Sequence, residues 1–213
     1  MSESEKLPPL FCSIGSETTA LSEDDLRTQL DSFLDAVGER EDVLLIPPDF
    51  TRFHSQAGII TRIISEYYNF TTTSPKNTGT TAEKKKKSCG RTNIAILPAL
   101  GTHAPMTETE IRKMFGDALA DKCDPSPFLV HDWRNDVVTI GEAPAFMVLE
   151  ATDGMVEKPW PAQLNQHVWS KRKSLHDPST QKHPSLVLSI GQVVPHEVMG
   201  MANFNKNLFV GTG

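Results

Sequence analysis

The sequence has too few cysteines for a disulfide framework or a zinc site. Cys12, Cys89 and Cys123 are odd in number and widely spaced, whereas disulfide-stapled domains usually carry even sets of cysteines at short spacings. The first residues, Met1 to Lys6, are polar and acidic and do not resemble a secretory or transit peptide. Unpaired thiols without a targeting segment predict a cytoplasmic protein in a reducing compartment.

Long apolar runs and an excess of basic charge are also missing. No run approaches the roughly 18 apolar residues of a membrane helix, so we expect no membrane partner. The chain carries 21 Lys and Arg against 27 Asp and Glu, and nucleic-acid-binding domains usually present a basic face, so we expect no nucleic acid partner. The glycine signatures of dinucleotide sites and P-loops are absent too, which argues against nucleotide binding through those motifs.

The sequence does contain an alternation of strand-like and helix-like segments. Continuous apolar runs, typical of strands buried on both faces, occur at 10–14, 43–46, 93–100, 127–130 and 186–190. Apolar residues recur at helical spacing over 26–37, 59–67 and 111–119. This order predicts an α/β fold with a mostly parallel, Rossmann-like sheet and helices on both faces. A length of 213 residues suits a single domain.

Local signals place several element boundaries. Ser22 and Asp25, like Thr107 and Glu110, have the spacing of a capping box at a helix start, and Gly38 suits a helix end. Segments 137–140 and 146–149 predict two further strands joined as a hairpin, and 164–169 predicts a helix before a loop over 174–184.

Residues 70–92 interrupt the pattern. The segment is rich in Thr, Ser and Lys and poor in apolar residues, which predicts a disordered surface insertion. Its run from Lys84 to Lys87 is consistent with a solvated loop or with a nuclear signal.

Polar and reactive residues follow three of the predicted strands. Asp49-Phe50-Thr51-Arg52 follows the second run, Gly101-Thr102-His103 follows the third, and Gly191 opens a loop that contains His196 and leads to Lys206. Right-handed crossovers bring the carboxyl ends of parallel strands to one edge of the sheet. We therefore expect these three loops to meet.

The residue types in these loops suit proton transfer on an anion. Arg52, near a predicted helix start, can bind phosphate or carboxylate, and a lysine such as Lys206 can bind phosphate or act as a nucleophile. His103 and His196 can take or give a proton near neutral pH. The alternatives are a capping role for Asp49 or Thr51, a solvated Arg52 and Lys206, and a loop His103 bonded to backbone. For His131 and Asp132, an orienting or structural role is favoured.

Taken in order, these motifs resemble the N-terminal domain of the nickel-dependent lactate racemase family. The resemblance rests on the sequence order of the motifs and on the ten-residue separation of His196 and Lys206. It covers about residues 10–213, with breaks at 70–92 and about 152–184, and implies that residues 1–213 form a single N-terminal domain. The motifs in question are Asp49-x-Thr51-Arg52, Gly101-Thr102-His103 with Thr107-x-x-Glu110, His131-Asp132, and Gly191-x-x-x-Pro195-His196-x-x-x-Gly200.

The resemblance implies a racemase or epimerase of a small 2-hydroxy acid. In that family a nickel pincer nucleotide, derived from nicotinic acid, is tethered to a lysine, which matches Lys206 here. Asp49, Thr51 and Arg52 match the loop that helps to hold the nucleotide. His103 and His196 match the two histidines that act as acid and base on opposite faces of the substrate carbon.

The chain departs from the family pattern at several points. Before Lys206 it reads Ala202-Asn203-Phe204-Asn205, where the family usually has Ser-Gly-Gly-x. The family's nickel-binding histidine and its C-terminal domain have no counterpart in the sequence, so no metal ligand is assigned. Two interpretations follow: an isomerase that works with a separate chain supplying the C-terminal domain, or a non-catalytic or truncated homologue that binds a nucleotide or an anionic metabolite.

Overall fold

The computed structural model describes residues 11–68, 92–121, 126–176, 185–196 and 200–213, without the side chains of 173–176. The helices are α1 Glu23–Val37, η1 Phe50–Ser55 (a 3₁₀ helix), α2 Ala57–Tyr67, α3 Glu108–Phe115, α4 Asp117–Ala120, α5 Ala145–Ala151, α6 Gln166–His176 and α7 Asn205–Phe209. The strands are β1 Asp42–Ile46, β2 Asn93–Ile96, β3 Val137–Ala143, β4 Trp160–Asn165, β5 Leu186–Ser189, β6 Pro195–His196 and β7 Gly200–Met201.

A parallel three-stranded sheet in the order β2-β1-β5 forms the centre of the fold. Val43 lies opposite Ile94 on one side and Leu186 on the other. Because β1 is central, its apolar run is buried on both faces, as the sequence predicts. The fold is therefore α/β.

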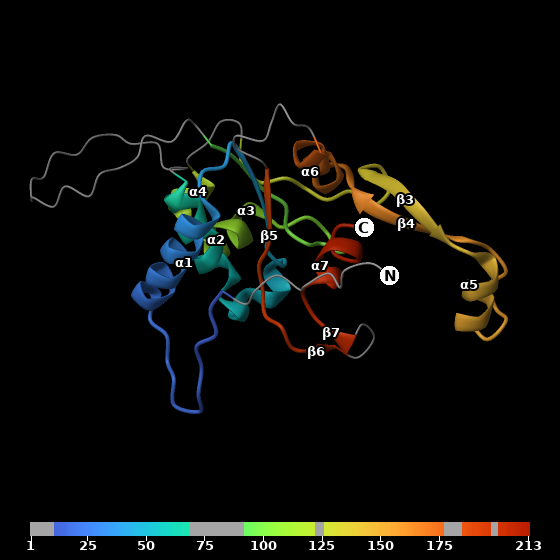
Figure 1. Cartoon of the computed structure of the whole chain (residues 1–213), viewed down its shortest axis with the longest axis horizontal. Helices are drawn as coiled ribbons and strands as arrows, with labels where there is room; N and C mark the ends of the chain where they lie inside the picture. Colours follow the sequence, from blue (N-terminus) through green and yellow to red (C-terminus); the bar gives the residue numbers. More distant parts are fainter. Residues whose placement is uncertain (1–10, 69–91, 122–125, 177–184, 197–199) are drawn as a thin grey trace, which may run out of the picture.

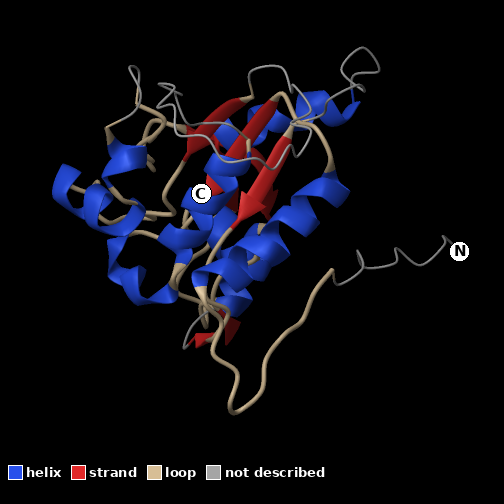
Figure 2. Ribbon diagram, turned by 90° about the vertical axis from the view of Figure 1, so that its left-hand side faces the viewer, coloured by secondary structure: helices blue, strands red, loops and turns tan. Residues whose placement is uncertain are grey.

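Helices cover both faces of this sheet (Figures 1 and 2). Alternate residues of β1 point to opposite sides, so Val43 and Leu45 pack against α1, α2, α3 and α4. Leu44 and Ile46 pack on the other face, where α6 and α7 contribute Val168 and Leu208. None of the helices in the described segments is long and apolar enough to cross a bilayer.

Both predicted capping boxes are present. The Ser22 hydroxyl accepts the backbone N–H of Asp25, whose carboxylate accepts the N–H of Ser22. Thr107 and Glu110 do the same for α3. α1 ends at Gly38, whose N–H donates to the carbonyl of Leu34 at 2.8 Å, and its φ of 82° is a conformation that glycine adopts without strain.

The antiparallel pair β3 and β4 forms an arm that extends from the body of the molecule, with α5 at its tip (Figure 1). The prediction that 146–149 pairs with 137–140 as a hairpin was wrong. The segment is helical in α5, which begins just after Pro144, and β4 takes the place beside β3. A short apolar run does not distinguish a strand from a helix, so its pairing depended on the tertiary structure.

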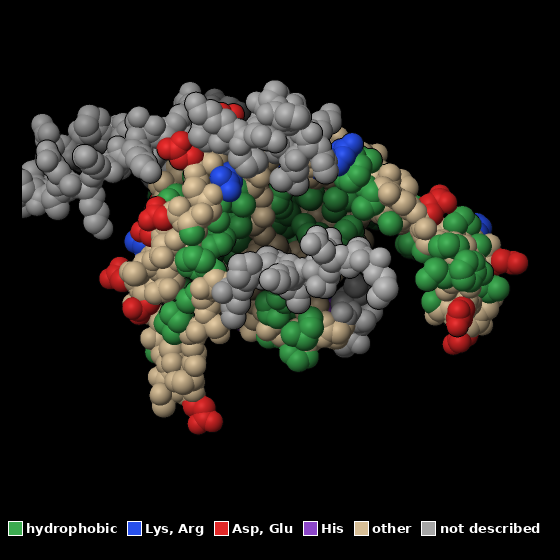
Figure 3. Space-filling view, viewed as in Figure 1, with side chains coloured by type: hydrophobic (Ala, Val, Ile, Leu, Met, Phe, Trp, Pro, Cys, Tyr) green, Lys and Arg blue, Asp and Glu red, His purple; other side chains and the backbone are tan. Residues whose placement is uncertain are grey.

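Apolar side chains gather at the tip of the arm (Figure 3). Phe146, Met147, Met155 and Trp160 are 52–82% exposed. Large exposed apolar patches commonly mark interaction surfaces.

Three further predictions need correction. The run at 10–14 forms no strand over its described part: Phe11 and Ile14 are exposed, and Phe11 packs edge-on against Phe33 of α1 instead. The run at 127–130 contributes only a single parallel bridge, between Phe128 and Ile96. Residues 174–176 belong to α6 rather than to a loop. Apart from Thr92, the predicted insertion at 70–92 lies outside the described residues.

Candidate functional site

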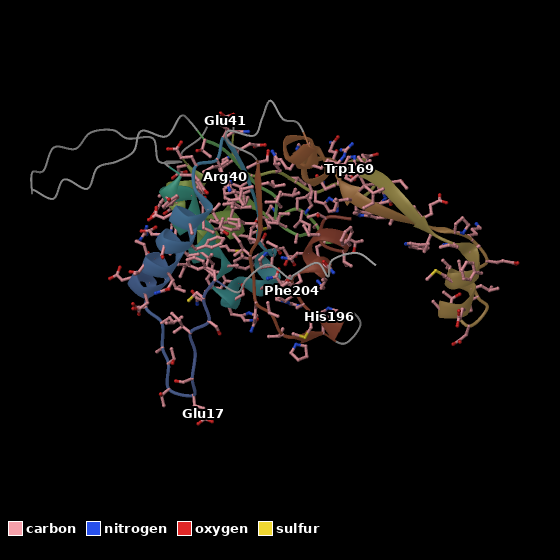
Figure 4. The ribbon with its side chains drawn as sticks, in the orientation of Figure 1. Glu17, Arg40, Glu41, Trp169, His196 and Phe204 are labelled. Carbon is pink, nitrogen blue, oxygen red and sulfur yellow. The ribbon has the colours of Figure 1, made fainter. Side chains whose placement is uncertain are left out.

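The three loops predicted to meet do line one pocket, of about 220 Å³. It lies at the carboxyl ends of β1, β2 and β5, and α7 forms part of its wall. Every residue predicted for the site lines it: Asp49, Thr51, Arg52, His103, His196 and Lys206. Figure 4 shows His196 and Phe204 at this end of the molecule, away from Arg40 and Glu41, which precede β1.

Backbone hydrogen bonds hold the loops together beyond the strands. The N–H of Ala99 donates to the carbonyl of Pro47 at 2.8 Å, so the first two loops stay parallel past the end of the sheet. The N–H of Gly101 donates to the carbonyl of Gly211 at 2.9 Å, which ties the second loop to the segment after α7. A Cβ on Gly211 would lie 2.6 Å from that of Ala99, so this contact requires glycine.

Asp49 is the buried polar centre of the pocket. Its side chain is 8% exposed, and its Oδ2 atom lies 2.5 Å from Nδ1 of His103. Its Oδ1 atom accepts from the backbone N–H and the hydroxyl of Thr51, at 3.1 and 2.5 Å. The N–H bond makes Asp49 the N-cap of η1. The capping alternative for Asp49 is therefore correct, and a contact to His103 accompanies it.

Two cationic side chains on the pocket wall have no carboxylate partner among the described residues. Arg52 is exposed, Lys206 is half-buried, and neither forms an ion pair within that part of the chain. An unneutralised cation pair in a concave site favours a ligand with phosphate or carboxylate groups. His196, half-buried in β6, provides a second imidazole on the same pocket.

A network of side-chain hydrogen bonds connects β5 to α7, and it was not predicted from the sequence. The Ser189 hydroxyl donates to Asn203 Oδ1 at 2.6 Å, and Asn203 Nδ2 donates to the Gly191 carbonyl at 3.1 Å. Asn207 Nδ2 donates to Ser189 Oγ at 3.2 Å. The repeated Asn at 203, 205 and 207 is the sequence feature that could have indicated this network. The network fixes the turn that precedes Lys206.

That turn has glycine-like backbone geometry without glycine. Asn203 has φ 63°, and Phe204 has φ 47° and ψ −129°. These are the positions where the lactate racemase family usually has two glycines. Asn tolerates the left-handed region, whereas Phe204 is held in a conformation that strongly favours glycine. The turn therefore has two positive-φ positions, and neither of them is occupied by glycine.

His131 lies outside this pocket and has a structural role, as the sequence favoured. It is 3% exposed, and its Nδ1 atom lies 2.9 Å from Asn165 Nδ2. Asn165 Oδ1 accepts the N–H of His167, which turns the Asn165 amide nitrogen toward the imidazole. Burial lowers the pKa of His131, and the backbone of Gly213 only partly opposes that shift. His131 Nε2 has no partner with good hydrogen-bond geometry in the described part of the chain.

The solved structures that resemble this fold include the following two. A protein from Thermotoga maritima matches with a TM-score of 0.62 and 21% identity, over 90% of this chain and 38% of its own. The lactate racemase apoprotein from Thermoanaerobacterium thermosaccharolyticum matches with a TM-score of 0.53 and 18% identity, over 90% and 37%. The chain therefore has a lactate-racemase-like fold. No protein-family profile and no curated protein matches the sequence.

The likeness to lactate racemase concerns the fold and only part of its length. The chain spans less than two fifths of each of the two solved chains. In the segments that the structure describes, no group of three or more His, Cys, Asp and Glu side chains is placed to hold a metal ion.

The strained turn predicts an unusual effect of glycine. Phe204→Gly should be more stable than Phe204→Ala by about 1 kcal/mol or more, because only glycine relieves the backbone strain at this φ and ψ. The alanine variant is the control for loss of the exposed ring, and urea denaturation measures both. A glycine variant less stable than the alanine variant contradicts the strain assignment.

The buried imidazole predicts loss of stability in mild acid. With its pKa lowered in the folded state, His131 stays neutral while the unfolded chain takes up a proton below about pH 6.5. The free energy of unfolding should therefore fall as the pH drops from about 7 to 5, by at most about 1.4 kcal/mol per pH unit from this group. His131→Gln should flatten that dependence in urea titrations. An unchanged slope would exclude His131 as its source.

Proposed function

We propose that this chain is the N-terminal domain of a lactate-racemase-like isomerase, acting on a small 2-hydroxy acid in the cytoplasm. The observation that carries the proposal is the convergence of Arg52, His103, His196 and Lys206 on one pocket at the carboxyl edge of a parallel sheet. The fold likeness to the lactate racemase apoprotein supports it. The sheet edge would then serve as a Rossmann-like nucleotide site.

The pocket fits the nickel pincer nucleotide in its charge and in its nucleophile. Lys206 is half-buried, lines the pocket and has no ion-pair partner in the described residues, so its amine is available as the tether. Arg52 would bind the phosphate of the nucleotide. The bound group supplies a hydride acceptor for C2 of the substrate.

The two histidines would perform the proton transfers. His103 or His196 would take the hydroxyl proton of the substrate and would later return a proton to the same oxygen. Racemisation must serve both enantiomers, so one base is needed on each side of the substrate carbon. The pocket offers one imidazole from the loop after β2 and one from β6.

We also propose a second domain, supplied by another chain or by a longer form of this one. Its support is the extent of the likeness, since over 60% of each of the two solved chains has no counterpart here. The exposed apolar tip of the β3–β4 arm offers a surface for it. The competing proposal is a domain that binds a nucleotide or an anionic metabolite without turnover, which the uncompensated charges of Arg52 and Lys206 favour equally.

The tether can be tested by intact-mass analysis. Protein co-expressed with the enzymes that make the cofactor should gain the mass of the nucleotide less its leaving group, and peptide mapping should place the gain on Lys206. Lys206→Arg should remain unmodified, whereas Lys158→Arg, at an exposed lysine outside the pocket, should be modified like the wild type. Unmodified wild-type protein, beside a working lactate racemase loaded in the same cells, would refute the cofactor assignment.

The acid–base roles predict the activity of two variants. In the loaded protein, supplied with a second domain, His103→Ala and His196→Ala should each lower the racemisation rate by about 10²–10⁴-fold, since that is the usual contribution of a general acid or base. The matched control is His54→Ala, at an exposed histidine outside the pocket. The interconversion of lactate enantiomers, followed by circular dichroism, is the measurement. Rates equal to the control would reject the two-base assignment.

A further inference from the structure

The contacts of Asp49 suggest a role different from ligand binding. Its carboxylate is almost fully buried and meets His103 with one oxygen and Thr51 with the other. Arg52, in the same loop, remains exposed and unpaired within the described residues. Within this loop, Asp49 is therefore buried and contacts the imidazole, whereas Arg52 is exposed and available to a ligand.

We propose that Asp49 and Thr51 are positioning residues that fix the tautomer of His103. An ionised carboxylate only accepts hydrogen bonds, so an ionised Asp49 at 2.5 Å would hold the proton on His103 Nδ1. In the neutral ring Nε2 is then the basic nitrogen. Among the described residues, the hydrogen bond of the His103 ring is the one through Nδ1, and the ring lines the pocket. The lone pair is therefore available to a ligand there.

Thr51 fixes the orientation of the carboxylate. Its backbone N–H and its hydroxyl both donate to Oδ1, which leaves Oδ2 for the imidazole. The arrangement resembles an aspartate that orients a catalytic histidine. For the proposed isomerase, on which this consequence rests, the hydroxyl proton of the substrate would move to His103 Nε2, and the negative charge of Asp49 would stabilise the resulting imidazolium.

The geometry gives a specific prediction for Asp49→Asn. The two donors of Thr51 would hold the amide oxygen at the position of Oδ1, so the amide nitrogen would take the place of Oδ2 and donate to His103 Nδ1. Neutral His103 would then carry its proton on Nε2, the opposite tautomer. The same substitution in serine-protease triads leaves the geometry intact and puts the histidine in the wrong tautomer.

Nitrogen-15 NMR of the 213-residue chain, without cofactor, tests this directly. Long-range proton–nitrogen spectra in mildly alkaline buffer distinguish the two ring nitrogens of each of the seven histidines, and His103→Gln identifies the His103 signals. Wild-type protein should show a protonated Nδ1 at His103, and Asp49→Asn a protonated Nε2. Asp132→Asn is the matched control, because Asp132 also caps a turn beside a histidine but does not contact His103, and it should keep the wild-type pattern.

Each outcome decides the proposal. A wild-type His103 protonated on Nε2 overturns it, as does a folded Asp49→Asn that keeps the wild-type tautomer. If Asp49→Asn does not fold, the wild-type spectrum alone gives the answer. In a loaded, active enzyme Asp49→Asn should lower kcat far more than it changes KM, on the scale of the about 10⁴-fold loss in serine proteases.

The spectroscopic result is independent of the proposed function. A fixed tautomer in a chain that never acquires an adduct on Lys206 would support the Asp49–His103 pair and refute the cofactor assignment. An adduct on Lys206 together with the opposite His103 tautomer would support the cofactor assignment and refute the Asp49–His103 pair.

Discussion

Parallel pairing of β1 with both of its neighbours is the constraint on which the rest of the structure depends. It buries β1 on two faces, so the strand must be apolar throughout and helices must cover both sides. It also directs the carboxyl ends of β1, β2 and β5 to one edge, where Asp49, His103 and His196 follow them. The pocket is thus a geometrical consequence of the sheet.

Within that pocket, buried polar contacts organise the exposed reactive groups. A buried carboxylate is costly unless it is hydrogen-bonded, and Asp49 has Thr51 and His103 as its partners. The amides of Asn203 and Asn207 act in the same way on the other wall, where they hold the turn before Lys206. These buried contacts hold the two walls of the pocket, where Arg52 and Lys206 remain available to an anion.

The turn before Lys206 has a backbone conformation that strongly favours glycine at Phe204. Asn203 and Phe204 both have positive φ. Hydrogen bonds from Asn203 to Ser189 and Gly191 hold the backbone there, and the conformation at Phe204 costs about 1–3 kcal/mol. Strain of this kind persists only where the surrounding contacts maintain it, so the position of Lys206 depends on that network.

The sequence by itself determined the sheet core, the helix caps and the edge at which the reactive residues meet. Buried strands such as 43–46 and capping pairs such as Ser22 and Asp25 are local signals. The right-handedness of parallel crossovers then brings the loops after the strands to one edge of the sheet. Only the tertiary structure decided which short apolar runs pair: 10–14 stays outside the sheet over its described part and 146–149 is helical. Only the tertiary structure joined Asp49 to His103, since that contact spans 54 residues and no local pattern encodes which polar side chains share a buried hydrogen bond.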